Sequence, residues 1–427
     1  MLASAKNVLF PLAVLAFVAV GITYLNDIFT TTTRWAFLAL LAASLLPEQD
    51  FLRPFRAPFA PVLFAYFLWC FATSAWSGVP LLSLLKSAAL TLTAAALMAG
   101  GQTWAANAKS RAAIYFLLPI TIVALLSGFL APGAQPTGSG LIIYQGLAQN
   151  PNYLGLVAAL GLPFPLYLGF VAKSRGQRII AALIVVALLF LLWRSGSRAS
   201  ILCGLIIAAI FAMVVSSGRR VSLAIALSVV VAGAVIVAPE LEQGVVERVV
   251  IKGKAGSDIF LSRRVTWQKS YEAARKGGVL GLGYGVSAGH SVFSFGLTAN
   301  TYGREKGNAQ LAVWEETGLV GLVLYWLLLV GIFGSLWSGL SKLRDREERA
   351  EAAVMIGALV GLLAQSCFEA WWTAPGSAES SLFWSTLGVT TGYLQLRTAT
   401  VDSASRQPAA RPFDRVPVPT AQIRWNG

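Results

Sequence analysis

Long apolar runs alternate with short polar connections along most of this chain. Because a helix of about 20 apolar residues crosses a bilayer, the pattern predicts an all-α polytopic membrane protein of about 12 transmembrane helices. The predicted helices are 7–26, 34–46, 58–76, 80–100, 112–131, 151–172, 178–193, 199–217, 221–238, 309–340, 350–372 and 380–396. One long polar segment interrupts the series, and we expect it to form a large loop that contains helical segments.

These runs divide the chain into four parts. Residues 1–238 hold the first nine predicted helices, 239–308 form the large loop, and 309–396 hold the last three. The tail, 397–427, is rich in Pro, Arg and Ala and lacks apolar periodicity. It is therefore expected to be disordered.

Composition agrees with the membrane class. Hydrophobic residues make up 56% of the chain, charged residues make up 12%, and the mean hydropathy is +0.68. A soluble domain contains about 25% charged residues. The net charge of +14 is not taken as a nucleic-acid signal, because excess Lys and Arg in a polytopic protein mark cytoplasmic loops and contacts with anionic lipid. No nucleic-acid partner is expected.

Lys and Arg are unevenly distributed among the connections, and this asymmetry predicts the orientation in the membrane. Clusters of Lys or Arg occupy alternate connections, and both residues are absent from 77–80, 132–150 and 373–379. Short cytoplasmic loops carry an excess of Lys and Arg. Both termini are therefore predicted to be cytoplasmic, and the large loop is predicted to lie on the outer side.

Two arginines break this rule. Arg194 and Arg198 lie in the short segment Trp193-Arg194-Ser195-Gly196-Ser197-Arg198, between two apolar runs on the predicted outer side. About one helical turn apart, they indicate a binding site for an anion. Lys86, near the outer end of the fourth predicted helix, either reaches the interface or points inward as a third positive charge.

The chain has three cysteines and a single histidine, His290. Each cysteine lies in an apolar run, and none belongs to a Cys-x-x-Cys spacing. This pattern indicates neither a disulfide framework nor a metal site. No metal and no cofactor are expected.

The large loop contains a basic segment, 262–276, whose pattern predicts an amphipathic helix carrying Arg263 and Arg264. Guanidinium groups bind phosphate in a bidentate manner, but a solvated or headgroup-facing charge is an equally good interpretation. The segment Gly281-Leu282-Gly283-Tyr284-Gly285 follows no predicted strand, which argues against a dinucleotide fingerprint. A tight turn whose backbone amides contact phosphate or sugar is the remaining functional interpretation.

Carboxylates near the outer membrane boundary are the candidate acids and bases. Glu315 and Glu316 begin one apolar run, and Glu369 and Glu379 flank an outer connection. Carboxylates at the edge of a span are costly and usually functional, although Glu315 and Glu316 also suit simple interfacial positions. Partial burial raises the pKa of such a group toward that of a general base.

Several segments, in their order along the chain, resemble the O-antigen ligase-like superfamily of polytopic glycosyltransferases, which includes Wzy-type polysaccharide polymerases. The matching segments are Ser74-Ala75-Trp76-Ser77, Asn150-Pro151-Asn152-Tyr153-Leu154-Gly155, Ser195-Gly196-Ser197-Arg198-Ala199, Arg264 with Trp267, Gly281-Leu282-Gly283-Tyr284-Gly285, and Glu316-Thr317-Gly318-Leu319-Val320-Gly321. Each is weak alone. Together with the layout of helices and one large loop, they extend over residues 60–330.

The resemblance implies glycan transfer at the periplasmic face of a bacterial inner membrane. The donor would be an oligosaccharide on undecaprenyl diphosphate and the acceptor a glycan hydroxyl, with inner-membrane lipid and chain-length or export proteins as further partners. Arg198 and Arg264 match the arginines that are thought to hold the diphosphate in this family. The predicted catalytic residues are Arg198, Arg264, Glu316 and Glu369, and the predicted diphosphate- or substrate-binding residues are Arg194, Lys86, Arg263, Asn308 and Asn152.

One departure bears on the type of transferase. Ligases of the family carry a histidine, often followed by Asn, late in the large loop, where it is proposed to activate the acceptor hydroxyl. Here Gly307 precedes Asn308, and His290 lies too far upstream to be the same residue. This favours a polymerase over an O-antigen ligase that transfers glycan to lipid A core. The candidate replacement bases are Glu305, Glu316 and Glu369.

A transporter or flippase of an anionic solute is the alternative from another class. Transport predicts charged or helix-breaking residues near the bilayer midplane, in repeated halves. The central parts of most predicted helices are apolar, and the polar groups gather toward the outer side. The sequence therefore favours the glycosyltransferase.

Overall fold

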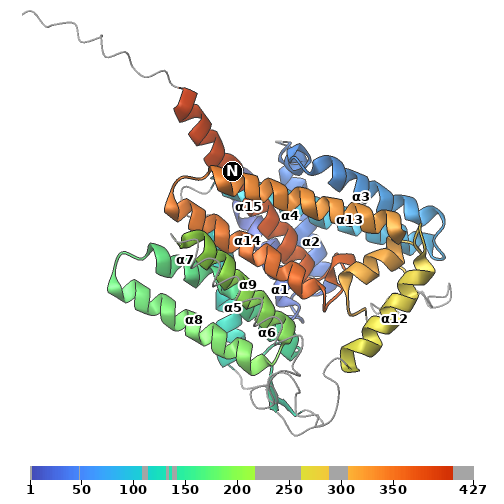
Figure 1. The fold of residues 1–427 in the computed structure, drawn as a ribbon, viewed down its shortest axis with the longest axis horizontal. Helices are drawn as coiled ribbons and strands as arrows, with labels where there is room; N and C mark the ends of the chain where they lie inside the picture. Colours follow the sequence, from blue (N-terminus) through green and yellow to red (C-terminus); the bar gives the residue numbers. More distant parts are fainter. Residues whose placement is uncertain are drawn as a thin grey trace, which may run out of the picture.

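A computed structural model of the chain describes residues 2–47, 49–107, 114–130, 134–136, 142–216, 261–287 and 306–406 (Figure 1). The predicted helix 221–238, most of the large loop with His290 and Glu305, and the end of the tail lie outside these residues. The helices are α1 (Leu2–Ala19), α2 (Thr31–Leu45), α3 (Ala60–Ala72), α4 (Pro80–Asn107), α5 (Leu118–Phe129), α6 (Pro151–Gly161), α7 (Pro163–Val171), α8 (Arg175–Ser195), α9 (Arg198–Val215), α12 (Leu261–Gly277), α13 (Ala309–Lys342), α14 (Arg346–Ser366) and α15 (Ala378–Arg406).

Short elements complete the described part of the chain. The 3-10 helices are η1 (Asp50–Arg56), η2 (Thr73–Ala75), η3 (Ile114–Leu117) and η6 (Trp371–Thr373). Strands β1 (Ala134–Pro136) and β2 (Ile142–Tyr144) pair antiparallel, with Ala134 opposite Tyr144. The expected helical class is confirmed, since these three-residue strands are the only sheet in the described ranges.

Six of the described helical segments are long and apolar enough to cross a membrane, or up to seven if a bent pair counts as one span. The six are Pro80–Asn107, Pro151–Val171, Arg175–Ser195, Arg198–Val215, Ala309–Lys342 and Arg346–Ser366. Three further apolar helices are shorter. A multi-pass membrane protein is therefore supported, whereas the full set of about 12 spans stays a prediction.

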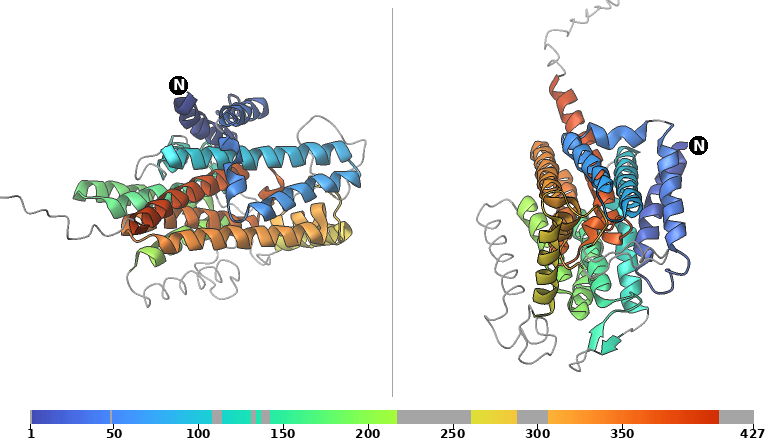
Figure 2. Two further views of the ribbon diagram at one scale, coloured as in Figure 1. Left: turned by 90° about the horizontal axis from the view of Figure 1, so that it is seen from above. Right: turned by 90° about the vertical axis from the view of Figure 1, so that its right-hand side faces the viewer.

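Helix α15 lies inside the bundle, between α4 and α13 (Figure 2, left). Its contact with α4 is close because both helices present glycine. A Cβ at Gly101 would lie 2.7 Å from the Val389 amide nitrogen, and one at Gly388 would overlap the backbone of Met98. Small residues let membrane helices approach in this way. Since protein surrounds α15, its many Ser and Thr side chains are buried. This helix is not among the described segments that are apolar enough to cross a membrane.

Helices α9 and α14 pack in a similar way. Gly357 approaches Ile207 and Gly361 approaches Cys203, so the two helices run antiparallel.

The α15 helix continues to Arg406, past the predicted end of the last span at residue 396. The boundary expected at residue 397 therefore differs from the observed helix end.

The predicted helix 309–340 is not one straight span. Its Gly318 has φ +70° and ψ −174°, which breaks the helix near its beginning. Gln310, before the break, donates a hydrogen bond to the Tyr325 hydroxyl after it (3.4 Å), so the two parts lie side by side. Figure 1 shows the first part as a short helix beside α12 and the second as the long helix labelled α13.

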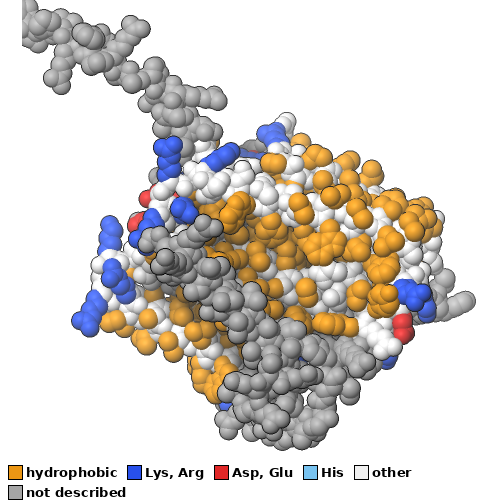
Figure 3. Space-filling view, viewed as in Figure 1, with side chains coloured by type: hydrophobic (Ala, Val, Ile, Leu, Met, Phe, Trp, Pro, Cys, Tyr) orange, Lys and Arg blue, Asp and Glu red, His pale blue; other side chains and the backbone are white. Residues whose placement is uncertain are grey.

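The surface separates charge from apolar side chains. In Figure 3 the Lys and Arg side chains gather mainly toward one side of a broad hydrophobic face, where the α7–α8 and α13–α14 connections lie in Figure 1. Lys173, Arg175 and Arg344 are exposed in these connections. This distribution matches the clusters from which the sequence predicts the cytoplasmic side.

Candidate functional site

The break in α13 is held by a glycine-rich loop, residues 278–286. Backbone hydrogen bonds join the two segments: Leu282 N to Glu315 O and Gly283 N to Glu316 O (3.0 Å each), Leu319 N to Gly278 O (3.1 Å), and Val320 N to Val279 O (3.3 Å). Backbone groups that leave a helix at membrane depth need such partners within the protein. The loop therefore replaces the helical hydrogen bonds that the break removes.

Glycine is required in this loop for both conformation and space. Gly283 has φ +111° and Gly285 has φ +76°, both in the left-handed region that favours glycine. A Cβ at Gly283 would overlap Ser77, and one at Gly285 would lie 2.5 Å from Cδ of Lys86. The loop thus lies directly against the start of α4.

Two buried carboxylates lie behind this loop. Both Glu315 and Glu316 are fully buried. Lys306 Nζ lies 2.5 Å from Glu316 Oε1 and 3.4 Å from Glu315 Oε2. The second oxygen of Glu316 accepts a hydrogen bond from the Gly285 amide at 2.6 Å. Both oxygens of Glu316 are thus engaged, which favours a positioning role for this residue over the catalytic role that the sequence predicts.

Lys86 points toward this cluster and not toward the interface. Its side chain is half-buried and lies against Gly285, whose amide contacts Glu316. The inward orientation is the second of the two alternatives that the sequence leaves open. The aliphatic part of the Lys86 side chain therefore packs on the loop whose Gly285 amide contacts Glu316, and its role in substrate binding stays a prediction.

Segments that are distant in sequence meet at the break. The indole nitrogen of Trp76 donates to the Gly281 carbonyl (3.1 Å), and that of Trp69 donates to the Thr317 carbonyl (2.8 Å). The Tyr284 amide donates to Thr73 Oγ1 at 2.9 Å. The predicted segments 74–77, 281–285 and 316–321 therefore form one structural unit.

The turn between α8 and α9 forms a second unit with the start of α6. Gly196 caps α8 with φ +59°, and the side chains of Ser195, Ser197 and Ser200 are buried. A Cβ at Gly155 would lie 2.8–3.0 Å from these three side chains. The predicted segments 150–155 and 195–199 are therefore in direct contact.

The arginines and Asn152 take different positions around this turn. Ser200 Oγ lies 3.4 Å from the Asn152 carbonyl oxygen, while the Asn152 side chain is exposed. Arg198 is half-buried at the first residue of α9. Arg194 is exposed, and its guanidinium lies over the Tyr144 ring of β2 at 5.7 Å. Arg198 is thus more buried than Arg194 and remains the stronger candidate.

Helix α12 confirms the helix expected over 262–276 and carries Arg263 and Arg264. It packs on the first part of α13. Trp267 donates through Nε1 to the Gly307 carbonyl at 3.0 Å, and the ring of Tyr271 contacts that of Trp314 at 6.0 Å. These contacts hold the backbone of the two arginines close to the start of α13.

A groove of about 840 Å³ lies between α12, both parts of α13 and the end of α14. It is lined by Trp267, Gln268, Tyr271, Asn308, Gln310, Leu311, Trp326 and Cys367. Asn308 caps α13 by accepting a hydrogen bond from the Leu311 amide (2.9 Å), and its Nδ2 donates to the Cys367 carbonyl (3.1 Å).

The α8–α9 turn and the groove lie at the same end of the bundle. Continuing the antiparallel register of α9 and α14 by about one turn brings Arg198 level with Ser366, at the end of α14. Ser366 Oγ accepts a hydrogen bond from Gln310 of the groove at 3.2 Å. Half-buried Glu369 follows a few residues later. Arg198, Asn308 and Glu369 therefore lie at about the same position along the long axis of the bundle.

Sequence reasoning did not single out Lys306, although it is central to the buried cluster. The available signal was the adjacent pair Glu315 and Glu316, because two neighbouring carboxylates at a membrane boundary need a compensating cation. The sequence offers several basic residues for that role. Only the folded arrangement selects Lys306.

In the ranges that the structure describes, no group of three or more His, Cys, Asp or Glu residues could hold a metal ion. Compared with protein-family models and with curated proteins, the chain gives no match. Its function therefore has to be argued from the site itself.

Proposed function

We propose that this chain is a membrane glycosyltransferase of about 12 spans that polymerises undecaprenyl-diphosphate-linked repeat units into an exopolysaccharide or O-antigen. The reaction would take place at the periplasmic face of a bacterial inner membrane. The supporting observation is the convergence of the Arg198 turn, the arginine-bearing helix α12 and the groove at one end of the bundle. This end of the bundle holds Arg198, the backbone of Arg263 and Arg264, and the aromatic side chains of the groove.

The residues suit the proposed transfer step. The acceptor hydroxyl oxygen attacks the anomeric carbon of the donor sugar, and the carbon–oxygen bond to the diphosphate breaks, with its electron pair leaving on undecaprenyl diphosphate. Arg198 and Arg264 would stabilise that charge as it develops. Glu369, which is half-buried and follows the end of α14, is the proposed base for the hydroxyl proton.

The groove suits a glycan in its chemistry. Tyr271 and Trp326 are about half exposed there, at 48% and 50%. Aromatic rings cover the apolar faces of sugars, and these two side chains present such surfaces in the groove. A chain of sugars held along this groove would pass the start of α13 and the end of α14, close to the proposed base.

The direct test is a reconstituted reaction. The full chain is placed in liposomes with a fluorescent undecaprenyl-diphosphate oligosaccharide, and the products are separated by length. We expect a ladder of polymer from the natural chain and strongly reduced polymer from Arg198→Ala or Arg264→Ala at equal protein level. Lys173→Gln, which changes an exposed cation at the other end of the bundle, is the control. Normal polymer from both arginine variants would overturn the proposal, and transfer only to lipid A core would identify a ligase.

The predicted orientation of the chain in the membrane is tested independently by cysteine labelling of intact cells. Gly78 and Gly176 have open space around an added Cβ, so both positions accept cysteine. In a background with Cys367→Ser, an impermeant thiol reagent should modify the Gly78→Cys variant and leave the Gly176→Cys variant unmodified. The opposite pattern would reverse the topology and remove the substrate site from the outer face.

One observation favours the alternative of a transporter. The break in α13 lies beside buried charges, as in the discontinuous helices of transporters. A fluorescent donor enclosed in the same liposomes separates the two functions. Movement of intact donor across the bilayer without new glycosidic bonds would support transport, whereas a ladder of products would support transfer.

A further inference from the structure

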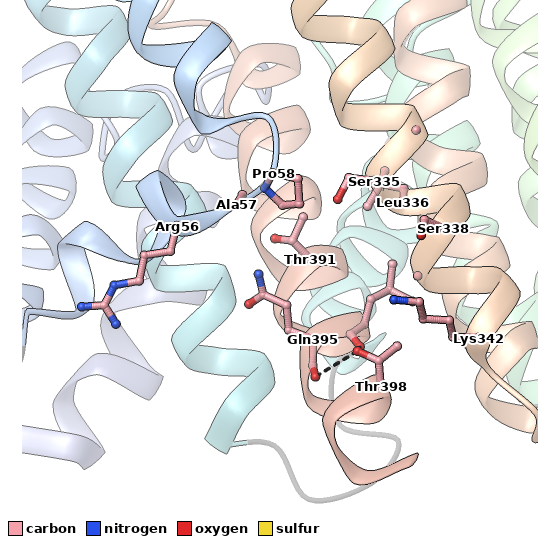
Figure 4. A pocket seen from close by; sticks show the side chains of 13 residues that line it. Arg56, Ala57, Pro58, Ser335, Leu336, Ser338, Lys342, Thr391, Gln395 and Thr398 are labelled. Atoms are coloured by element: carbon pink, nitrogen blue, oxygen red, sulfur yellow. Dashed lines mark hydrogen bonds between the residues drawn. The ribbon is translucent and has the colours of Figure 1, made fainter. Parts of the chain in front are cut away.

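A second pocket lies at the other end of the bundle and takes no part in the proposed reaction. Its volume is about 580 Å³, within the usual range of ligand sites. It opens between α13 and α15 and is closed on a third side by the segment 56–58 after η1 (Figure 4). The residues that line it are Arg56, Ala57, Pro58, Gly334, Ser335, Leu336, Ser338, Gly339, Lys342, Thr391, Leu394, Gln395 and Thr398.

The hollow follows from the spacing of small residues on two helices. On α13, Gly334, Ser335, Ser338 and Gly339 recur at helical spacing and present little volume to α15. A Cβ at Gly334 would meet open space, whereas one at Gly339 would lie 3.0 Å from Leu394. The two helices therefore touch at Gly339 and separate at Gly334.

The lining is positively charged and rich in hydrogen-bond donors. Lys342 and Arg56 are its charged residues, and none of the residues that line it is acidic. In Figure 4 the Lys342 amine points from α13 toward α15, while the Arg56 guanidinium extends away along the flank. The Ser335 hydroxyl and the Gln395 amide face the same hollow. This set suits a phosphate group.

The position of the pocket favours a lipid as the source of that phosphate. The lipid-facing side of α13 next to the pocket is apolar, with Val330 70% and Trp337 68% exposed. Exposed tryptophan is typical of the boundary between hydrocarbon and headgroups. A headgroup in the pocket would leave its acyl chains along this side of α13. Basic pockets between helices on the cytoplasmic side bind anionic headgroups.

We propose that the pocket between α13 and α15 binds the phosphate of an anionic glycerophospholipid, with Lys342 as its main cation and Arg56 as a flanking one. The proposal does not depend on the glycosyltransferase activity. A bound lipid would join the second part of α13 to α15, and α15 packs along α4 through the centre of the bundle. Lipid at one end would thereby stabilise the helices that form the other end.

The test uses the full chain in detergent, titrated with phosphatidylglycerol, phosphatidylcholine or soluble glycerol phosphate. Native mass spectrometry counts the bound lipid, and the thermal midpoint measures stabilisation. We expect selective retention of phosphatidylglycerol and roughly fivefold weaker binding for Lys342→Gln, with a smaller loss for Arg56→Gln. Lys173→Gln, an exposed cation at the same end of the bundle but outside the pocket, should bind as the natural chain does.

A second variant separates the pocket from general surface charge. Gly334→Leu adds volume where the structure has open space and changes no charge. It should abolish the selective binding while the chain stays folded. Equal retention of phosphatidylglycerol and phosphatidylcholine, or unchanged binding in both Lys342→Gln and Gly334→Leu, would overturn the proposal. Equal stabilisation by glycerol phosphate alone would show that the pocket binds soluble phosphates, and it would overturn the proposal of a bound lipid.

Discussion

The break in α13 and the turn between α8 and α9 are both tight turns at the outer end of the bundle as the sequence orients it, and each uses a glycine with positive φ, Gly318 and Gly196. They handle charge in different ways. At the α13 break, Glu316 and Lys306 are buried and paired with each other. At the α8–α9 turn, the buried side chains are small hydroxyls, and Arg198 is half-buried at the edge.

This difference separates a structural unit from a candidate binding unit. A buried ion pair that also accepts a backbone hydrogen bond, as Glu316 does from Gly285, holds distant segments in register. Arg198 is half-buried at the start of a helix, so part of its side chain is exposed at the surface. We therefore expect changes at the α13 break to lower stability, and changes at the α8–α9 turn to lower activity.

The largest expected effect on stability is that of Lys306→Met. It leaves the carboxylates of Glu315 and Glu316 buried without this cation, which costs about 3–5 kcal/mol of unfolding free energy. Thermal unfolding in detergent measures the loss. The double change Lys306→Met with Glu316→Gln should lose less than the single change, since one buried charge is then removed. If the single variant unfolds at the same temperature as the natural chain, the ion pair does not stabilise the structure around the break.

The next effect is on activity. Arg198→Ala should lower the rate of polymer formation by about 10²–10³-fold through loss of charge stabilisation, with a change in thermal midpoint of only a few degrees. Arg194→Ala is the matched control, because Arg194 is exposed and lies over Tyr144. Equal losses of activity in the two variants would mean that the turn acts through general charge and not through Arg198.

The glycine-rich loop gives a smaller, purely steric effect. Gly283→Ala should destabilise the chain by about 2–4 kcal/mol, through positive φ and overlap with Ser77. Gly278 also has positive φ, at +56°, but a Cβ there meets open space. Gly278→Ala should therefore cost only about 1 kcal/mol. Thermal unfolding compares the two, and equal costs would show that the loop does not pack closely on the start of α4.

The smallest effect is expected at Asn308, which belongs to the groove. Asn308→Ala removes the helix cap and the hydrogen bond to the Cys367 carbonyl, at about 2 kcal/mol together. Asn308→Asp keeps the cap and loses only the donor, so it should cost about half as much. Denaturant unfolding resolves this difference, and identical values would mean that the bond to Cys367 contributes nothing.

Much of the candidate site could be predicted because its signals are local. Helical periodicity predicts α12 over 262–276, and the charge asymmetry draws attention to Arg194 and Arg198 before any fold is known. Helix α15 is harder to recognise by hydropathy, since burial against α4 and α13 lets Ser and Thr replace apolar residues. The break at Gly318 is hidden for a similar reason, because apolar residues continue beyond it.

The sequence by itself determined the membrane class, most helix positions and the types of residue available for chemistry, since these depend on composition and on spacing along one helix. Only the tertiary structure decided which of those residues meet. It paired Glu316 with Lys306 and directed Lys86 inward, while Arg198 came level with the groove. The reason is physical: the partner of a buried charge is selected by the packing of distant segments, and small residues such as Gly283 and Gly361 set how closely those segments approach.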